Sequence, residues 1–256
     1  MKNRVLRDIR FYESDQPNEA GVSLPRNLGK VFSIDREHLE NGRRIARRLE
    51  NFGFSVGTPD HVYFNLTTAA PSGSITRSPR IVDERIVYLD CGLDPNMVNR
   101  LAAAAKDTFV ADLVLKGLCL LSRDDIEANG HLQTVKEEVR AHGSHLMIFC
   151  KKKETKSYLL EVFYKIRPDN AASVGIVRFT DKKTGHSGQT DFIDLCTYSD
   201  IYPLTGTISV TGGVVTIKPR ESFRASISTE RYCTPITIET QKILKSKESH
   251  AGASDT

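Results

Sequence analysis

A chain of 256 residues with 39% apolar and 27% charged residues has the composition of a globular protein and is long enough to bury a substantial core without disulfide bonds. Its formal net charge of +4 is far below the dense positive charge of a dedicated nucleic-acid-binding protein, which disfavours nucleic acid as a partner. The charged start of the chain does not fit a secretory signal peptide, and no apolar run is long enough to cross a bilayer. We therefore expect a cytoplasmic protein without a membrane partner.

The first part of the chain predicts one strand followed by one amphipathic helix. Residues 4–12 have the composition of a short strand. Ser33 or Asp35 is placed to cap the helix, in which apolar residues recur every three or four positions as far as Phe52. Gly53 suits the C-terminal cap, because glycine adopts the left-handed conformation without a steric penalty.

Two strands separated by a loop are expected next. Residues 61–66 predict the first of these strands. The proline, glycine and serine residues between positions 67 and 80 exclude regular structure and indicate a mobile loop. Residues 81–91 place apolar and charged side chains on both sides, which is typical of a partly exposed strand.

Two helices complete this part of the chain. Asp94-Pro95 is a strong helix start, because the aspartate accepts a backbone N–H bond and the proline has no N–H to leave unsatisfied. We expect this helix to run to about Leu121. A second helix is expected to follow at once, with an apolar stripe that begins at Ile126, and to end at Gly143.

From Ser144 onward the pattern changes to the alternation that is typical of strands. Residues 146–150 and 158–166 predict a hairpin around a charged turn. Further strands are predicted at residues 173–181, 190–198, 206–210, 214–218, 223–228 and 235–240.

These elements together predict an α+β fold. Residues 1–143 are expected to form a mixed α/β part with about three helices, and residues 144–244 an antiparallel β-meander of about six strands that packs on it. Residues 245–256 contain no aromatic residue and little apolar material, so we expect a disordered tail.

The cysteines predict neither disulfide bonds nor a metal centre. They are five in number and widely spaced, and most lie within apolar runs: Cys91, Cys119, Cys150, Cys196 and Cys233. No two of them form a Cys-x-x-Cys pair, and the nearest histidines do not match a zinc spacing. We expect free, buried thiols in a reducing compartment.

The chain lacks the sequence patterns of phosphate-binding loops, nucleophile elbows and zinc-protease helices, so no catalytic residue, metal or cofactor is assigned. One arrangement is compatible with metal-dependent cleavage of a phosphodiester. Asp83 or Asp90 on a strand, with Glu154 and Lys156 in a later β region, would place two carboxylates on a metal and a lysine beside the attacking water. Charged residues at a hairpin turn are normally only solvated, so this enzyme is kept as an alternative.

A second acidic group lies between residues 90 and 94. Cys91 precedes a predicted helix start, where a thiol becomes more acidic and could act as a nucleophile. However, Asp90 and Asp94 oppose the formation of a thiolate, and Asp94 is needed as the helix cap. The segment is better interpreted as a strand-to-helix junction.

Four arginines of the first predicted helix are the candidate partner-binding residues. Arg43, Arg44, Arg47 and Arg48 form two pairs of like charges four positions apart, and the apolar stripe on the other side of the helix predicts that they face outward. Replacing Arg44 and Arg48 with glutamine is therefore expected to leave stability unchanged or slightly higher.

We expect a non-catalytic binding protein that acts through a protein–protein interface, such as a neutraliser of a toxin enzyme in the same cell. The basic arginine face predicts a protein partner with an acidic face. The alternatives are the nuclease-like enzyme with a dispersed site and a nucleic-acid-binding module that uses residues 43–48 and 151–156. That module is disfavoured, because few aromatic residues for base stacking lie near these charges.

Overall fold

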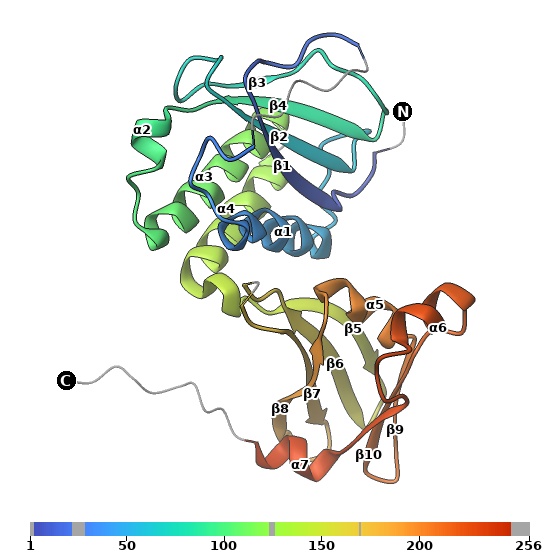
Figure 1. Cartoon of the computed structure of the whole chain (residues 1–256). Helices are drawn as coiled ribbons and strands as arrows, with labels where there is room; N and C mark the ends of the chain where they lie inside the picture. Colours follow the sequence, from blue (N-terminus) through green and yellow to red (C-terminus); the bar gives the residue numbers. More distant parts are fainter. Residues whose placement is uncertain (1–2, 22–28, 123–125, 169, 247–256) are drawn as a thin grey trace, which may run out of the picture. The chain divides into compact units, whose positions relative to one another are not determined.

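The computed structural model describes residues 3–21, 29–122, 126–168 and 170–246. The chain divides into two compact units, Met1–Leu146 and Met147–Thr256 (Figure 1). The predicted α+β class is confirmed, whereas the predicted packing of the second part on the first stays a prediction. Within the described ranges, no helix combines the length and the apolar content needed to cross a membrane.

The first unit is built around a mixed four-stranded sheet. Its strands are β1 (Asp8–Ser14), β2 (His61–Thr67), β3 (Ile75–Arg77) and β4 (Ile86–Gly92), in the order β1-β2-β4-β3. β1, β2 and β4 run parallel, and β3 pairs antiparallel at the edge. Parallel neighbours require a crossover, which α1 (Arg36–Asn51) supplies between β1 and β2. The carboxyl ends of three strands therefore share one edge of the sheet.

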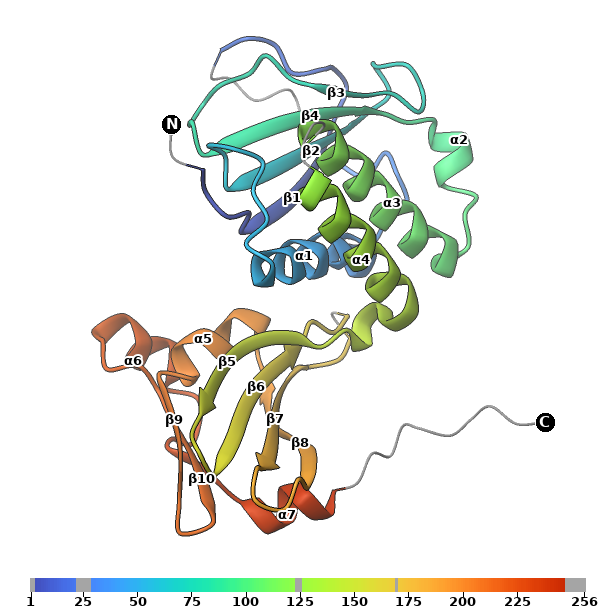
Figure 2. The same cartoon turned by 180° about the vertical axis from the view of Figure 1, so that it is seen from behind.

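Helices cover one face of this sheet (Figures 1 and 2). The other long helices are α3 (Ala103–Leu121) and α4 (Ile126–His142), which packs against α1 and α3. Phe11, Phe64 and Leu89 form one row across β1, β2 and β4 and face the helices. A Cβ atom at Gly42 of α1 would lie 2.7 Å from the Phe11 ring, and one at Gly117 of α3 would lie 2.6 Å from the Phe64 ring. The two glycines thus allow close contact between helix and sheet.

The helix predicted from residue 94 to Leu121 is in fact two helices, α2 (Pro95–Val98) and α3. Asp94 caps α2 as predicted, because its carboxylate accepts the backbone N–H of Asn96 at 2.8 Å. The break follows at Asn99. Its side chain accepts from the backbone N–H of Ser33 at 2.6 Å and donates to the Val31 carbonyl at 3.2 Å, so it joins a distant segment at the point where α2 ends.

The predicted irregular loop at 67–80 contains the short strand β3, so the exclusion of regular structure there was wrong. Residues 75–77 pair with β4, and the backbone N–H of Ser78 donates to the Tyr88 carbonyl at 2.9 Å. The partly exposed strand predicted at 81–91 was also wrong in part. β4 begins at Ile86 and is largely buried, because helices cover one side and Arg80 lies over the Tyr88 ring on the other.

The second unit contains two antiparallel sheets. One has the order β5-β6-β7-β8 and consists of Ile148–Glu154, Tyr158–Lys165, Ser173–Asp181 and Ser187–Leu195. The other has the order β11-β10-β9, with β9 at Thr207–Thr211, β10 at Val214–Lys218 and β11 at Ile236–Glu239. The predicted hairpin is confirmed as β5 and β6. The predicted single meander of about six strands is instead divided between two sheets.

Short helices complete the second unit: α5 (Ile201–Leu204), α6 (Phe223–Thr229) and α7 (Thr240–Lys245), with single 3-10 turns at Gly143–His145 in the first unit and Tyr198–Asp200 in the second. The strand predicted at 223–228 was wrong, since these residues form α6. The Ser222 hydroxyl accepts the backbone N–H of Ala225 at 3.2 Å and caps this helix. Most of the predicted tail, residues 247–256, lies outside the described residues.

Candidate functional site

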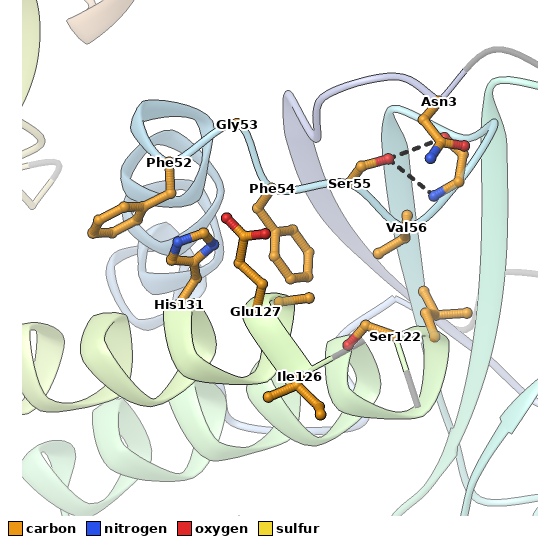
Figure 3. A pocket seen from close by; sticks show the side chains of 13 residues that line it. Asn3, Phe52, Gly53, Phe54, Ser55, Val56, Ser122, Ile126, Glu127 and His131 are labelled. Carbon is orange, nitrogen blue, oxygen red and sulfur yellow. Dashed lines mark hydrogen bonds between the residues drawn. The ribbon is translucent and has the colours of Figure 1, made fainter. Parts of the chain in front are cut away.

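A hollow of about 890 Å³ lies in the first unit, between the turn that follows α1 and the start of α4 (Figure 3). Its lining includes residues 52–57 from the turn, Leu121 and Ser122 at the end of α3, and Ile126, Glu127, Ala128 and His131 of α4. Phe52, Phe54 and Leu121 supply apolar walls, while the lining as a whole exposes about as much polar as apolar surface. A concave surface that combines apolar walls with several polar groups is suited to bind a ligand or a partner.

The turn that forms one wall is held by several backbone contacts. α1 ends at Phe52, and Gly53 takes a positive φ of 71°, as predicted for its cap. The backbone N–H of Phe54 donates to the Leu49 carbonyl at 3.1 Å, and the Phe54 side chain is buried. The Ser55 hydroxyl then donates to the Gly57 carbonyl at 3.2 Å and accepts the Gly57 N–H at 3.0 Å. This wall is therefore preformed.

Phe52 is clamped between groups from α1 and α4. The His131 ring stacks on it with 4.7 Å between centroids and 13° between planes. The Arg48 guanidinium lies 4.4 Å from the centre of the same ring. Arg48 also donates to both carboxylate oxygens of Glu138, at 2.6 and 2.8 Å. These contacts join α1 to α4 and fix the aromatic wall of the hollow.

The first turn of α4 forms the opposite wall. Figure 3 shows Glu127 and His131 rising from α4 toward Phe52 and Phe54. Ile126 is 89% exposed, which contradicts its predicted place in the apolar stripe of this helix. The reason is its position, because Ile126 precedes Leu132 by six residues and so lies on another face of the helix.

Glu127 is the charged group of the hollow. Its side chain has no hydrogen-bond or ion-pair partner among the described residues. Of the described lining residues, it is the one carboxylate, and none is a lysine or an arginine. At the start of α4 the negative charge also interacts favourably with the helix dipole, which is a structural reason for an acidic residue here.

The predicted outward-facing arginines are not a free cationic surface. Arg44 is 3% exposed and donates to the Asn41 side chain at 2.7 Å, so its outward orientation was wrong. Carboxylates of the same unit pair with the others: Arg43 with Glu40, Arg47 with Glu50 at 2.8 Å, and Arg48 with Glu138. α1 contacts β1, α3 and α4 together, so little of its circumference faces solvent. Partner binding by these arginines stays a prediction.

A second polar group lies at the carboxyl ends of the parallel strands, where open α/β sheets commonly bind ligands. Tyr12, Asn65 and Asp90 occupy matching positions on β1, β2 and β4, one residue beyond the row that faces the helices. They therefore point to the opposite face. Asp90 is 3% exposed.

The Asp90 carboxylate is already engaged by three donors. The backbone N–H of Asn18 lies 3.1 Å from each carboxylate oxygen, and the side-chain amides of Asn18 and Asn65 donate at 2.7 Å. The hydroxyls of Ser14 and Tyr12 in turn donate to the Asn65 and Asn18 amide oxygens, at 2.7 Å each. Burial raises the pKa of Tyr12. We call these five residues the sealed cluster, because they satisfy one another in the interior.

The segment after Asp90 is a strand-to-helix junction, as predicted. Asp94 serves as the cap of α2, and Cys91 is fully buried. Burial, aided by the charge of Asp90, raises the pKa of the Cys91 thiol to about 12, so the thiol stays protonated near neutral pH. Cys91 is therefore unsuited to act as a nucleophile.

All five cysteines are free thiols, but their predicted burial was wrong for three. Cys119, Cys196 and Cys233 are exposed, and Cys150 is half-buried. A cysteine within an apolar stretch is buried only if its own position faces the core. Cys196 follows the end of β8 and Cys233 precedes β11, so neither lies inside a packed element.

The carboxylates of the nuclease-like alternative have structural partners. Asp83 is exposed and accepts the backbone N–H of Arg85 at 2.8 Å in a turn, and Asp90 belongs to the sealed cluster. Glu154 pairs with Lys182. Across the described part of the chain, no group of three or more histidine, cysteine or acidic side chains is arranged to hold a metal ion. The enzyme alternative stays a hypothesis.

The sequence interpretation missed the hollow because its residues come from separate segments. The one available signal was Ile126, a large apolar residue that is out of phase with the stripe of its own helix. Comparisons of the chain with protein-family models, with curated proteins and with solved structures found no match.

Proposed function

We propose that the chain is a non-catalytic cytoplasmic binding protein that acts through a protein–protein interface, and that the hollow beside Ile126 is the centre of that interface. The observation that carries the proposal is the exposure of Ile126 at 89% on the rim of a hollow with an aromatic wall. A large apolar side chain in water next to a concave aromatic wall offers a partner both a protruding and a concave contact. Burying such a side chain contributes about 1.5–3 kcal/mol.

The rigidity of the walls supports a role in binding. Phe52 is held by Arg48 and His131, and Phe54 is anchored by its backbone bond to Leu49. A preformed site loses little conformational entropy when a partner docks, so more of the contact energy appears as affinity. Well-packed aromatic residues in a pocket are also typical of the energetic centres of protein interfaces.

Neutralisation of a toxin enzyme in the same cell is the specific form of binding that we retain. The paired arginines bear on the chemistry of such a partner. An acidic partner that used Arg43, Arg47 or Arg48 would have to compete with Glu40, Glu50 and Glu138, which already pair with them. Their contribution would then be to the rate and specificity of encounter more than to affinity.

Site-specific photo-crosslinking in the cells that make the protein tests this proposal. A photoreactive benzoylphenylalanine placed at position 126 should capture one defined protein after irradiation. The matched control is position 81, because Ile81 is also a large apolar residue of the first unit and is 73% exposed. Capture at 126 and not at 81 is the expected result.

A substitution completes the test. Ile126→Ser should reduce recovery of that same protein at least tenfold in co-purification, since the lost apolar contact is worth about 1.4 kcal/mol or more. Ile81→Ser should not. The proposal fails if position 126 captures nothing, or if both positions capture the same set of proteins.

A further inference from the structure

We infer that the partner segment which enters the hollow carries an apolar side chain next to a positively charged group. This inference rests on the proposed function and specifies the partner's chemistry at the same site. It differs from the acidic partner that the arginines of α1 predicted, because it is argued from Glu127, a carboxylate that has no partner among the described residues.

The arginines near the hollow are paired with carboxylates, whereas Glu127 is not paired with any described residue. Around the end of α1, the cations are compensated: Arg47 by Glu50 and Arg48 by Glu138, both at hydrogen-bond distance. Glu127, by contrast, has no partner among the described residues. A partner that approaches this surface therefore meets Arg47 and Arg48 already paired with carboxylates and, among the described lining residues, one carboxylate without a partner.

Glu127 lies on the same side of the hollow as His131 and faces the aromatic wall. It precedes His131 by one helical turn, and Figure 3 shows both side chains pointing toward Phe52 and Phe54. Ile126, its neighbour, stands at the rim. An apolar group seated against the aromatic wall therefore has the Glu127 carboxylate as a neighbour in the same hollow, so a cation carried beside that apolar group would pair with it.

The alternative charge is disfavoured by the same arrangement. An acidic group carried into the hollow would face Glu127 without a lysine or arginine among the described lining residues to offset the repulsion. Like charges at short range cost free energy even near a surface, where the effective dielectric constant is about 20. The described lining residues thus favour a partner with a positive charge beside the apolar group.

Two matched small probes test this inference without knowledge of the partner. 4-Phenylbutylammonium and 4-phenylbutyrate carry the same phenyl ring and opposite charges. Binding to the full chain is followed through the methyl resonance of Ile126 by NMR. We expect the cation to bind about two- to fivefold more tightly than the anion, the range of an exposed ion pair. High salt should reduce this ratio.

Charge removal assigns the preference to one residue. In Glu127→Gln the ratio should fall to about one, whereas in Glu137→Gln, which removes an exposed carboxylate farther along α4, it should be kept. The inference is overturned if the anion binds as tightly as the cation, if neither probe binds, or if the preference survives Glu127→Gln.

The experiments can contradict the proposed binding function and the inferred positive charge of the partner independently of each other. If position 126 captures a protein in cells but the probes show no preference for the cation, the binding function stands and this inference falls. If the probes show the preference but position 126 captures no protein, the hollow is a site for small cationic molecules and the proposed function falls.

Discussion

Asp90 and Glu127 are two carboxylates of the same unit with opposite surroundings. Asp90 is buried and accepts bonds from three amide groups of Asn18 and Asn65. Glu127 is exposed at the hollow formed with Phe52 and Phe54 and has no partner among the described residues. Asp90 lies where an α/β sheet would commonly bind a ligand, yet its carboxylate already accepts hydrogen bonds from within the unit. The proposed binding site is therefore placed at the carboxylate whose hydrogen-bonding capacity is not used by the described residues.

The largest loss of stability is expected from a substitution that breaks the sealed cluster. Asp90→Ala leaves the donors of Asn18 and Asn65 unsatisfied in the interior and should lower the free energy of unfolding by about 3 kcal/mol or more. Glu127→Ala should change it by less than about 0.5 kcal/mol, apart from the small helix-dipole contribution. Denaturant unfolding measures both. Equal effects of the two substitutions would remove the distinction between the sites.

The next largest change in stability is expected on the apolar face of the same sheet, which packs against the helices. In Gly117→Ala the new Cβ would lie 2.6 Å from the Phe64 ring and 2.8 Å from Leu89, so we expect a loss of about 1–3 kcal/mol from overpacking. Gly130→Ala in α4 meets nothing within 4 Å and should instead stabilise the protein by about 0.5–1 kcal/mol. Opposite signs in thermal unfolding would verify the close contact of α3 with the sheet.

The arginines of α1 should have a moderate effect. Arg44 is buried and Arg48 bonds to Glu138 and covers Phe52, so Arg44→Gln with Arg48→Gln should lower stability by about 1–3 kcal/mol. This reverses the expectation from sequence, in which both side chains face outward. Arg36→Gln, whose side chain is 69% exposed, is the control and should change stability by less than about 0.5 kcal/mol. An unchanged melting temperature in the double variant would contradict the packing of α1.

The smallest effect concerns a third carboxylate, Asp60, which is buried like Asp90 but charge-paired. Burial alone would raise its pKa, but hydrogen bonds from Arg85 and His61 outweigh burial and hold the pKa below its ordinary value. Asp60 therefore adds stability above the pKa of the unfolded chain, and this stability is lost as the pH falls through the lower folded value. Asp60→Asn should flatten the decline of unfolding free energy below about pH 4. An unchanged acid profile would exclude this contribution.

Local patterns were sufficient to predict most elements. The alternation at 173–181 and 214–218 matches the bounds of β7 and β10, and Asp94 and Gly53 act as the predicted helix caps. The α+β class follows from these elements. The errors arose where distant segments meet: Asn99 bonds to residues 31 and 33 as α2 ends, and residues 75–77 form a strand because β4 offers an edge.

The candidate site was less predictable for the same reason. Helical spacing placed the four arginines on one outward face, but Arg44 is buried, and the carboxylate that pairs with Arg48 comes from α4, ninety residues away. The hollow combines the end of α1 with the start of α4. No local pattern relates these segments, because their contact depends on how both helices pack.

The two kinds of strand order have a consequence for folding. In the second unit, β5 to β8 pair in sequence order through hairpins, so each pairing closes only a short length of chain. In the first unit, the pairing of β1 with β2 brings Asp8 beside His61, although all of α1 lies between these residues in the sequence. Closing such a long loop costs more entropy before any contact repays it, which slows assembly. On the ribosome, the unit that emerges first is therefore the one whose sheet is slower to form.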